Sequence, residues 1–331
     1  MYKIIIDTKG SDNGPSVITA GACQALAKFD NLEVILVGDH DVILEEVKKQ
    51  NAPLDRIEII DAPDEINNYD NPMSAVFEKP NSSLIVALDT YSKRDDICGM
   101  LNSGNTGAVL TGCMRFLAGE KRVRPAMAAV MFTSNGNLTC MLDSGSVVDC
   151  NAETLVEYAH LGAEFMGKMY GIENPRVALL SNGSESTKGN KVVKEAHKLL
   201  VESDLNFVGN VEGNTALNGL CDVLVCDGFA GNLVLKVTEG TAKRILTDIV
   251  KYAKETGSKE AMELFNHLLK AYDISSLGGG VILGISKTVI KTRSAADEKT
   301  ILSTTEMILN MAQNKEIYDK TKLKEINHVQ N

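Results

Sequence analysis

The feature that most constrains the fold is a junction between an apolar run and a glycine-rich loop. Residues 221–236 read Cys-Asp-Val-Leu-Val-Cys-Asp-Gly-Phe-Ala-Gly-Asn-Leu-Val-Leu-Lys. The apolar run 223–226 predicts a strand that ends at Asp227, and a helix is expected to begin shortly after the glycines. In a parallel α/β sheet, such a junction lies at the carboxyl edge of the strands, where ligands bind.

Three other loops repeat this design of an apolar strand, a glycine loop with Ser, Thr, Asn or Asp, and a helix. They span residues 7–15, 102–107 and 181–190. Glycine lets a backbone N–H approach an oxyanion closely, and a helix start attracts anions. Any one loop is more simply explained as an ordinary capped turn. Four in one chain favour a site for a phosphate-like anion, whereas no Walker A loop or full G-x-G-x-x-G fingerprint indicates a nucleotide.

The hydrophobic pattern alternates between strands and helices, which predicts an α/β fold with a mainly parallel sheet. Strands are expected at 3–7, 33–38, 56–60, 97–101, 126–132, 138–143, 177–180, 206–208 and 223–226. Helices are expected at 15–28, 42–50, 83–93, from about 105, and at 152–170, 233–254, 259–271 and 295–312. Strands 126–132 and 138–143 are expected to pair as a hairpin. Residues 61–82 are expected to be loop-rich, and residues 314–331 a loose tail.

No linker rich in Pro, Gly or Ser divides the 331 residues, so we expect a single domain over residues 1–331. The pattern at about 233–271 is helical but is broken at Gly257-Ser258. It predicts a helical hairpin that stands off the sheet.

Composition excludes several classes of function. The net charge is -10, tryptophan is absent and aromatic residues make up 5%, so a nucleic-acid partner is not expected. The seven scattered cysteines show no CxxC spacing, which is typical of reduced thiols in a cytoplasmic protein. No apolar run reaches transmembrane length. We expect a soluble, cytoplasmic protein with no metal.

The densest basic cluster is Lys-Arg-Val-Arg-Pro at residues 121–125. Its Arg122 and Arg124 are candidates for holding phosphate or docking an acidic partner, and a solvated surface turn explains them equally well. The basic residues of the predicted hairpin are more simply a solvated helix face. They are Lys243, Arg244, Lys251 and Lys254.

Cys226 is the best-placed candidate nucleophile for acyl transfer, because it directly precedes Asp227. Its alternating apolar surroundings are more typical of a buried small hydrophobe. None of the five histidines lies in a glycine loop, so a histidine-based triad is not predicted.

Several motifs, taken together and in order, are specific to one family. They are Ser-Gly-Asn-Thr-Gly-Ala (103–108), Arg-Pro-Ala (124–126), Leu-Asp-x-Gly (142–145), Lys-Gly-Asn (188–190), Phe-Val-Gly-Asn-Val-Glu-Gly (207–213) and Cys-Asp-Gly-Phe-x-Gly-Asn (226–232). From Ile4 to about Ile301 the chain resembles the bacterial phosphate acyltransferases of the PlsX type. The resemblance implies a Rossmann-like three-layer αβα fold, related to phosphotransacetylases and to isocitrate/isopropylmalate dehydrogenase-like folds.

The resemblance also implies an activity and its partners. Enzymes of this family convert acyl-[acyl carrier protein] and inorganic phosphate into acyl phosphate and free carrier in phospholipid synthesis, without a cofactor. They are homodimers with the hairpin at the interface and near the membrane. For this chain we expect weak peripheral contact with the inner face of the membrane and a glycerol-3-phosphate acyltransferase as a downstream partner.

Site residues follow from the matched motifs. Lys188, Asp227 and Asn232 are predicted to be catalytic, with Asp227 orienting phosphate or taking its proton and Asn232 stabilising the oxyanion. Arg122 and Arg124 are predicted to dock the carrier. The residues predicted to bind phosphate or substrate are Gly104, Asn105, Thr106, Gly107, Asn190, Gly228, Gly231 and Lys236.

Four loops depart from the family pattern. The departures include Thr8, Lys9 and Ser11, Ser146 and Val147, Ser181 to Glu185, and Thr292 and Arg293. They leave two alternatives open: a short-chain phosphotransacetylase or phosphotransbutyrylase acting on acyl-CoA, and a non-catalytic paralog that binds phosphate or acyl phosphate. A dehydrogenase is a more distant alternative, because the chain has no dinucleotide fingerprint.

Overall fold

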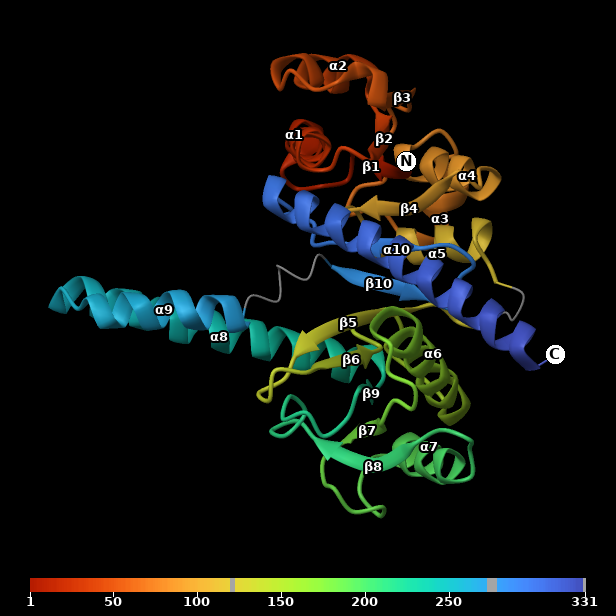
Figure 1. Cartoon of the computed structure of the whole chain (residues 1–331), viewed down its shortest axis with the longest axis vertical. Coiled ribbons are helices and arrows are strands. Elements are labelled where there is room, and N and C mark those ends of the chain that lie inside the picture. Colours follow the sequence, from red (N-terminus) through yellow and green to blue (C-terminus); the bar gives the residue numbers. More distant parts are fainter. Residues whose placement is uncertain (120–122, 273–278, 330–331) are drawn as a thin grey trace. The chain divides into compact units, whose positions relative to one another are not determined.

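The computed structural model describes residues 1–119, 123–272 and 279–329. The chain packs into two compact units. Unit 1 comprises Met1–Met127, Gly167–Ile172 and Gly278–Asn331, and unit 2 comprises Ala128–Met166 and Glu173–Leu277. Each unit has strands at its centre and helices against them (Figure 1). The predicted α/β fold is confirmed, whereas the expectation of one domain over residues 1–331 stays a prediction.

The strands of unit 1 are all parallel to their neighbours except β10, which runs antiparallel to β11. In spatial order they are β3 (Ile57–Asp61), β2 (Leu32–Gly38), β1 (Tyr2–Asp7), β4 (Ile97–Asn102), β11 (Val289–Lys291) and β10 (Gly280–Leu283). Helices of this unit form two groups. One is α1 (Gly14–Lys28), α2 (His40–Lys49) and α10 (Glu298–Val329), and the other is α3 (Pro72–Glu78), α4 (Ser83–Lys93) and α5 (Thr106–Phe116).

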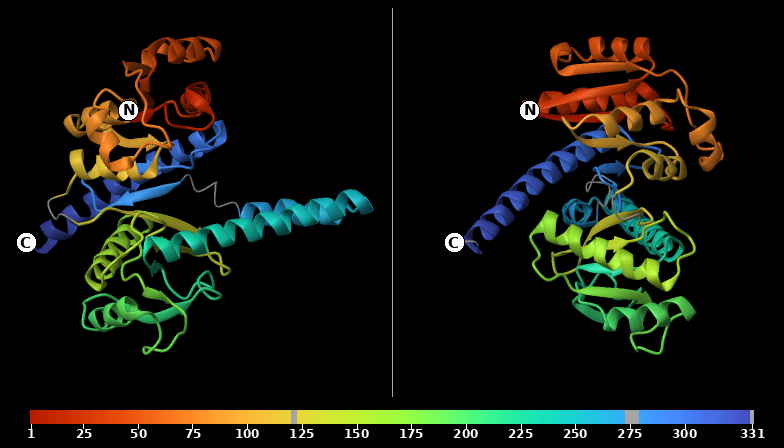
Figure 2. Two further views of the ribbon diagram at one scale, coloured as in Figure 1. Left: turned by 180° about the vertical axis from the view of Figure 1, so that it is seen from behind. Right: turned by 90° about the vertical axis from the view of Figure 1, so that its right-hand side faces the viewer.

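The two-residue period of the strands assigns each helix group to one face. On β4, a Cβ at Gly99 would lie 2.3 Å from Cγ2 of Ile308, so this face lies against α10. The next residue, Met100, is fully buried in the core that Leu88 of α4 and Val109 of α5 share. The strands are therefore covered by helices on both faces, as a parallel sheet requires (Figure 2).

Unit 2 has the same kind of arrangement, with helices packed against a smaller number of strands. In spatial order they are β5 (Ala126–Phe132), β6 (Leu138–Leu142), β9 (Val223–Val225), β7 (Val177–Ser181) and β8 (Phe207–Glu212). β5 and β6 form the predicted antiparallel hairpin, and the other pairs are parallel. The helices are α6 (Ala152–Tyr170), α7 (Lys191–Val201), α8 (Gly228–Thr256) and α9 (Lys259–Tyr272).

Alternation along β9 again separates the two faces. Val223 faces α6, because a Cβ added at Gly162 of that helix would lie 2.5 Å from Cγ1 of Val223. Leu224 and Cys226 belong to the core on the other side, together with Ala230 and Val234 of α8. The first turns of α8 are therefore anchored against the end of β9.

The rest of α8 pairs with α9 as the predicted hairpin, which extends beyond the other elements of unit 2 (Figures 1 and 2). Gly257 ends α8 with φ 69°, a left-handed conformation that glycine adopts easily. Three of the 29 residues of α8 are buried. Most of α8 is therefore exposed or only partly buried, and its packing partners include α9 and β6 of the same unit.

Several elements differ from the sequence predictions. α8 begins at Gly228, so Gly228 and Gly231, which were expected in a loop before the helix, lie inside its first turns. α3 lies in the segment expected to be loop, although Asn71 accepts hydrogen bonds from the N–H groups of Met73 and Ser74 and Pro72 fills the first position. β11 was not predicted, because its three residues include a lysine. The loose tail expected from residue 314 is wrong as far as Val329, where α10 ends.

Candidate functional site

The carboxyl ends of three neighbouring strands of unit 2 carry the predicted site loops. β6, β9 and β7 are adjacent and parallel. Their loops, residues 143–147, 226–228 and 182–190, therefore follow one edge of the strands. This edge holds every predicted catalytic residue.

Asp143 organises the first of these loops. Its carboxylate is fully buried and accepts hydrogen bonds from the backbone N–H groups of Gly145, Ser146 and Val147, at 3.0, 2.9 and 2.6 Å. Three N–H donors around one carboxylate fold the loop tightly. Val147, one of the predicted departures from the family pattern, is 5% exposed and contributes its backbone N–H to the loop.

The start of α8 is pressed against this loop through two glycines. A Cβ at Gly231 would lie 1.9 Å from the carbonyl oxygen of Asp143, and one at Gly228 would lie 2.7 Å from its Oδ2. The Gly228 N–H donates to the Val147 carbonyl at 2.7 Å. Both glycines therefore allow the start of α8 to pack closely against the 143–147 loop. The predicted contact of these glycines with substrate stays a prediction.

Asp227 and Asn232 lie at this end of α8. Asp227 is half-buried, and its Oδ1 accepts the Ala230 N–H at 2.7 Å as the helix cap. Its Oδ2 has no hydrogen-bond partner among the described residues. Asn232 is exposed and lies beside Gly145, where a Cβ would come 3.5 Å from the Asn232 Cβ. Gly145 has φ 143°, a region that favours glycine.

Lys188 and Asn190 lie in the loop between β7 and α7. The Lys188 stem covers Gly183, where a Cβ would lie 2.5 Å from its Cγ, and the side chain is exposed. Asn190 Oδ1 accepts the Val193 N–H at 2.9 Å and so caps α7. No hydrogen bond joins Lys188 to Asp227 or Asn232. Lys236, one turn beyond Asn232 on α8, pairs with Glu239 at 2.7 Å.

The predicted Gly104–Gly107 loop belongs to unit 1, at the carboxyl end of β4. Asn105 Oδ1 accepts the Ala108 N–H at 3.1 Å and caps α5, and its Nδ2 donates to the Asn67 carbonyl. Thr106 and Gly107 are half-buried in the first turn of α5. Sequence reasoning joined this loop to Lys188 and Asn190 in one phosphate site, and that joint site stays a prediction.

The predicted carrier-docking residues are partly described. Arg122 lies outside the described residues. Arg124 is exposed and makes no ion pair or side-chain hydrogen bond with another residue that the structure describes. Its docking of an acidic partner stays a prediction.

Cys226 is 4% exposed, and its Sγ donates to the Asp143 carbonyl at 3.4 Å. Burial, reinforced by the charges of Asp143 and Asp227, raises the pKa of the Cys226 thiol well above its usual 9. A thiol that stays protonated is a poor nucleophile. The interpretation of Cys226 as a buried small hydrophobe is confirmed.

Sequence reasoning did not include Asp7, Asn102, Asp143 or Lys291 among the site residues. Asp7 ends β1, and its Oδ2 accepts the Asn102 Nδ2 at 2.8 Å. Burial raises the pKa of Asp7 to about 6. The available signal was a polar residue that directly follows an apolar strand, as in Ile4-Ile5-Ile6-Asp7 and Met141-Leu142-Asp143.

Across the described ranges, no three His, Cys, Asp or Glu side chains gather as a candidate metal site. Among the same residues, no helix is both long enough and apolar enough to cross a membrane.

Comparison with known proteins decides the family. The family model described as "Fatty acid synthesis protein" matches residues 2–318. The chain belongs to this family. It is 36% identical over 319 residues to the phosphate acyltransferase of Thermoanaerobacter pseudethanolicus, covering 94% of each chain. It is also 36% identical over 320 residues to that of Streptococcus pneumoniae, covering 94% of this chain and 95% of the relative. The resemblance found in the sequence motifs is confirmed.

Solved structures agree with the Rossmann-like fold. A phosphotransacetylase from Streptococcus pyogenes aligns with TM-score 0.61 at 17% identity, over 95% of this chain and 94% of that one. A 4-hydroxythreonine-4-phosphate dehydrogenase from Klebsiella pneumoniae aligns with TM-score 0.58 at 11% identity, over 94% and 100%. At these identities the likeness is one of fold.

Proposed function

We propose that this protein transfers an acyl group from acyl-[acyl carrier protein] to inorganic phosphate, yielding acyl phosphate and free carrier. The observation that carries the proposal is the 36% identity to a phosphate acyltransferase over 94% of both chains. The loops that hold Lys188, Asp227 and Asn232 lie inside the matched region.

In the proposed reaction a phosphate oxygen attacks the thioester carbonyl, a C–O bond forms, and the C–S bond then breaks. Phosphate is already nucleophilic at neutral pH, so positioning supplies much of the rate. Lys188 would balance the charge of phosphate, and Asn232 Nδ2 would donate to the oxyanion. The unpartnered Oδ2 of Asp227 would take the phosphate proton, which the departing thiolate finally receives. No enzyme thioester is needed, in keeping with the buried Cys226.

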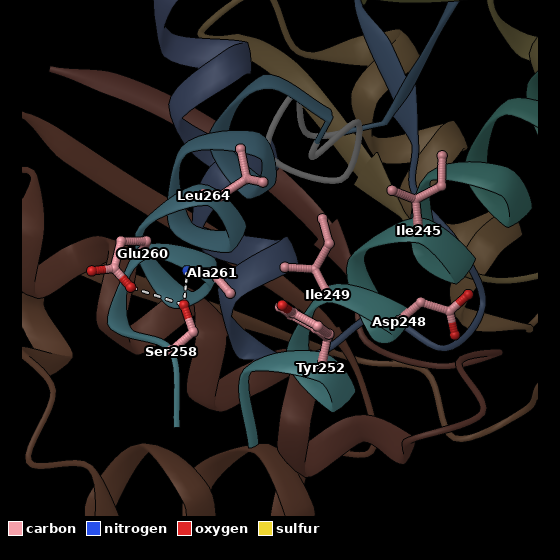
Figure 3. A pocket seen from close by; sticks show the side chains of 8 residues that line it. All are labelled: Ile245, Asp248, Ile249, Tyr252, Ser258, Glu260, Ala261 and Leu264. Carbon is pink, nitrogen blue, oxygen red and sulfur yellow. Dashed lines mark hydrogen bonds between the residues drawn. The ribbon is translucent and has the colours of Figure 1, made fainter. Parts of the chain in front are cut away.

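The α8–α9 hairpin is proposed to hold the homodimer together. Several large apolar side chains of the hairpin are exposed, among them Val237, Met262 and Leu269, and such surfaces are typical of interaction sites. A groove of about 590 Å³ between the two helices is lined by Ile245, Ile249, Tyr252 and Leu264, with polar residues at its rim (Figure 3). Ile245 is 51% exposed and Tyr252 59%. A second copy of the hairpin would cover this surface.

Arg124, with Arg122, is proposed to dock the acidic carrier. The basic residues on α8 are weaker candidates, because Arg244 pairs with Asp248 at 2.8 Å and Lys251 lies 3.9 Å from Glu255. Such pairs on one helix are typical of a solvated face. Contact with the membrane is proposed to be weak and peripheral, since the hairpin tip carries Lys254, Lys259 and Glu260.

The test is release of carrier thiol that depends on added phosphate, compared for palmitoyl-carrier and butyryl-CoA. We expect turnover with the carrier donor. Lys188→Ala and Asn232→Ala should each lower kcat by about 10²- to 10³-fold, whereas Lys194→Ala, an exposed lysine on α7, should leave it unchanged. Turnover with butyryl-CoA alone would instead indicate the short-chain class. Binding of phosphate without turnover of either donor would indicate the non-catalytic paralog.

A further inference from the structure

A row of polar residues crosses three neighbouring strands of unit 1. Asp7, Asn102 and Lys291 are the last residues of β1, β4 and β11. Asn102 and Lys291 are register partners, and the Thr292 N–H donates to the Asn102 carbonyl at 2.9 Å. Register partners in a parallel pair point to the same face. Lys291 therefore lies at the ligand-binding edge of the unit, beside the strand end from which the 103–107 loop departs.

Lys291 is a buried cation that forms no ion pair with any residue the structure describes. It is 6% exposed, and its ammonium donates to the carbonyl of Thr292, the adjacent residue. No carboxylate of the described residues lies within 4.0 Å of it. Burial lowers the pKa of Lys291 to about 8, and the charge of Asp12 opposes this only in part. Burying an unpaired charge is strongly unfavourable.

Lys287, four residues earlier, shows how a structural lysine is held in the same part of the fold. Its ammonium donates to the carbonyls of Tyr91 and Arg94 at 2.9 and 2.8 Å and pairs with Asp95 at 3.1 Å. Lys287 thus fills its donor capacity with protein atoms. Lys291 does not.

The loop next to Lys291 has further groups suited to an anion. The Ser103 hydroxyl is fully buried and has no hydrogen-bond partner in the part of the chain that the structure describes. The α5 helix starts at Thr106, and its own first turn carries no acidic residue that would offset the positive end of the helix. A Cβ at Gly10 would lie 2.9 Å from Gly104 Cα, so glycines bring the two neighbouring loops into backbone contact.

We propose that Lys291, the Ser103 hydroxyl and the start of α5 form a subsite for a phosphate group in unit 1, with Lys291 supplying the charge. The subsite rests on the proposed function for its ligand, inorganic phosphate or the phosphate group of the product. A cation retained without a protein partner is stabilised when an anion binds beside it. Ser103 and the first N–H groups of α5 would donate to the phosphate oxygens.

The test compares Lys291→Met with Lys287→Met. Lys291→Met should raise the phosphate KM by about 10- to 100-fold and leave the KM for acyl carrier within about twofold. It should also abolish the rise in melting temperature that inorganic phosphate gives the unmodified protein. Its melting temperature without phosphate should be unchanged or higher, because an apolar chain of similar volume replaces an unpaired charge. Lys287→Met should lower the melting temperature and leave the phosphate KM unchanged.

Several outcomes would overturn the subsite. One is a Lys291→Met variant whose phosphate KM and phosphate-induced stabilisation match those of the unmodified protein. Another is a loss of stability equal to that of Lys287→Met with unchanged phosphate KM, which is the behaviour of a structural lysine. Failure of the unmodified protein to make acyl phosphate would contradict the proposed function alone. In that case, phosphate-induced stabilisation that Lys291→Met abolishes would still support the subsite.

Discussion

At the scale of single residues, two buried carboxylates stand at the ends of strands, and they differ in how well hydrogen bonds compensate their burial. Asp143 is surrounded by three backbone N–H donors and fixes the loop on which the start of α8 rests. Asp7 accepts hydrogen bonds from Asn102 and the Lys9 N–H, yet its burial outweighs them and raises its pKa to about 6. A native state that holds this proton more tightly than the unfolded chain has a stability that depends on pH.

Asp7→Asn should reveal this dependence. Between pH 3.8 and about 6 the folded protein binds more protons at Asp7 than the unfolded chain does. The free energy of unfolding of the natural protein, relative to the variant, should therefore fall as pH rises through this window, by up to about 3 kcal/mol. Above pH 6 the difference should be flat. Urea denaturation at steps from pH 4 to pH 7 measures it, with exposed Asp41→Asn as the control. Parallel stability curves for Asp7→Asn and the natural protein would contradict the assignment.

Cys226 provides a second test at this scale. Because its thiol is buried and protonated, Cys226→Ala should keep kcat within about threefold and cost about 1 kcal/mol of stability from lost packing. Native protein should retain activity after treatment with iodoacetamide, and mass spectrometry should find Cys226 unmodified. A Cys226→Ala variant that folds but loses turnover would indicate that the acyl group is transferred through a covalent thioester on Cys226.

At the scale of elements, the start of α8 depends on contacts that only glycine allows. Gly231→Ala should destabilise the protein by about 2–4 kcal/mol, because the added Cβ would lie 1.9 Å from the Asp143 carbonyl oxygen. Gly240→Ala is the matched control in the same helix. Nothing lies within 4 Å of its Cβ position, so it should stabilise α8 by up to about 1 kcal/mol. Thermal unfolding followed by circular dichroism compares the two. Equal effects of both substitutions would contradict the close packing at Gly231.

The hairpin exposes large apolar side chains, among them Ile245 and Tyr252, which are 51% and 59% exposed. Ile245→Asp, on the groove, should convert a dimer to a monomer while the helical content is preserved. Light scattering after size-exclusion chromatography measures the mass, with Thr247→Asp, on exposed α8 surface outside the groove lining, as the control. A natural protein that is already monomeric, or an Ile245→Asp variant that stays dimeric, would rule out the groove as the interface.

At the scale of the whole molecule, the sequence predicts elements well where local signals agree. The α4 helix at Ser83–Lys93 and the β5–β6 hairpin follow from periodicity and turn residues. β11 could not be predicted, because three residues ending in lysine look like a loop until they pair with β4. The same holds for Lys291, whose importance depends on burial between strands far apart in the sequence.

The site was predictable to the level of loops. Strand ends with Gly, Asn and Asp predicted site loops at 102–107, 181–190 and 227–232, but not the role of the buried carboxylates Asp7 and Asp143. Asp143 is recognisable only when its three N–H donors are seen. The departure at Ser11 also gains a physical reason from the fold, since the Ser11 hydroxyl donates to the Ser294 carbonyl at 2.9 Å and ties two loops of unit 1 together.

The most direct test of the central claim is to trap the product itself. Purified protein, palmitoyl-carrier and phosphate are incubated, hydroxylamine is added, and palmitoyl hydroxamate is measured against reactions lacking phosphate. We expect hydroxamate that requires phosphate, enzyme and the carrier donor, and that falls strongly in Lys188→Ala and Asn232→Ala. Release of carrier thiol without phosphate-dependent hydroxamate would show hydrolysis of the thioester instead, and would contradict acyl transfer to phosphate.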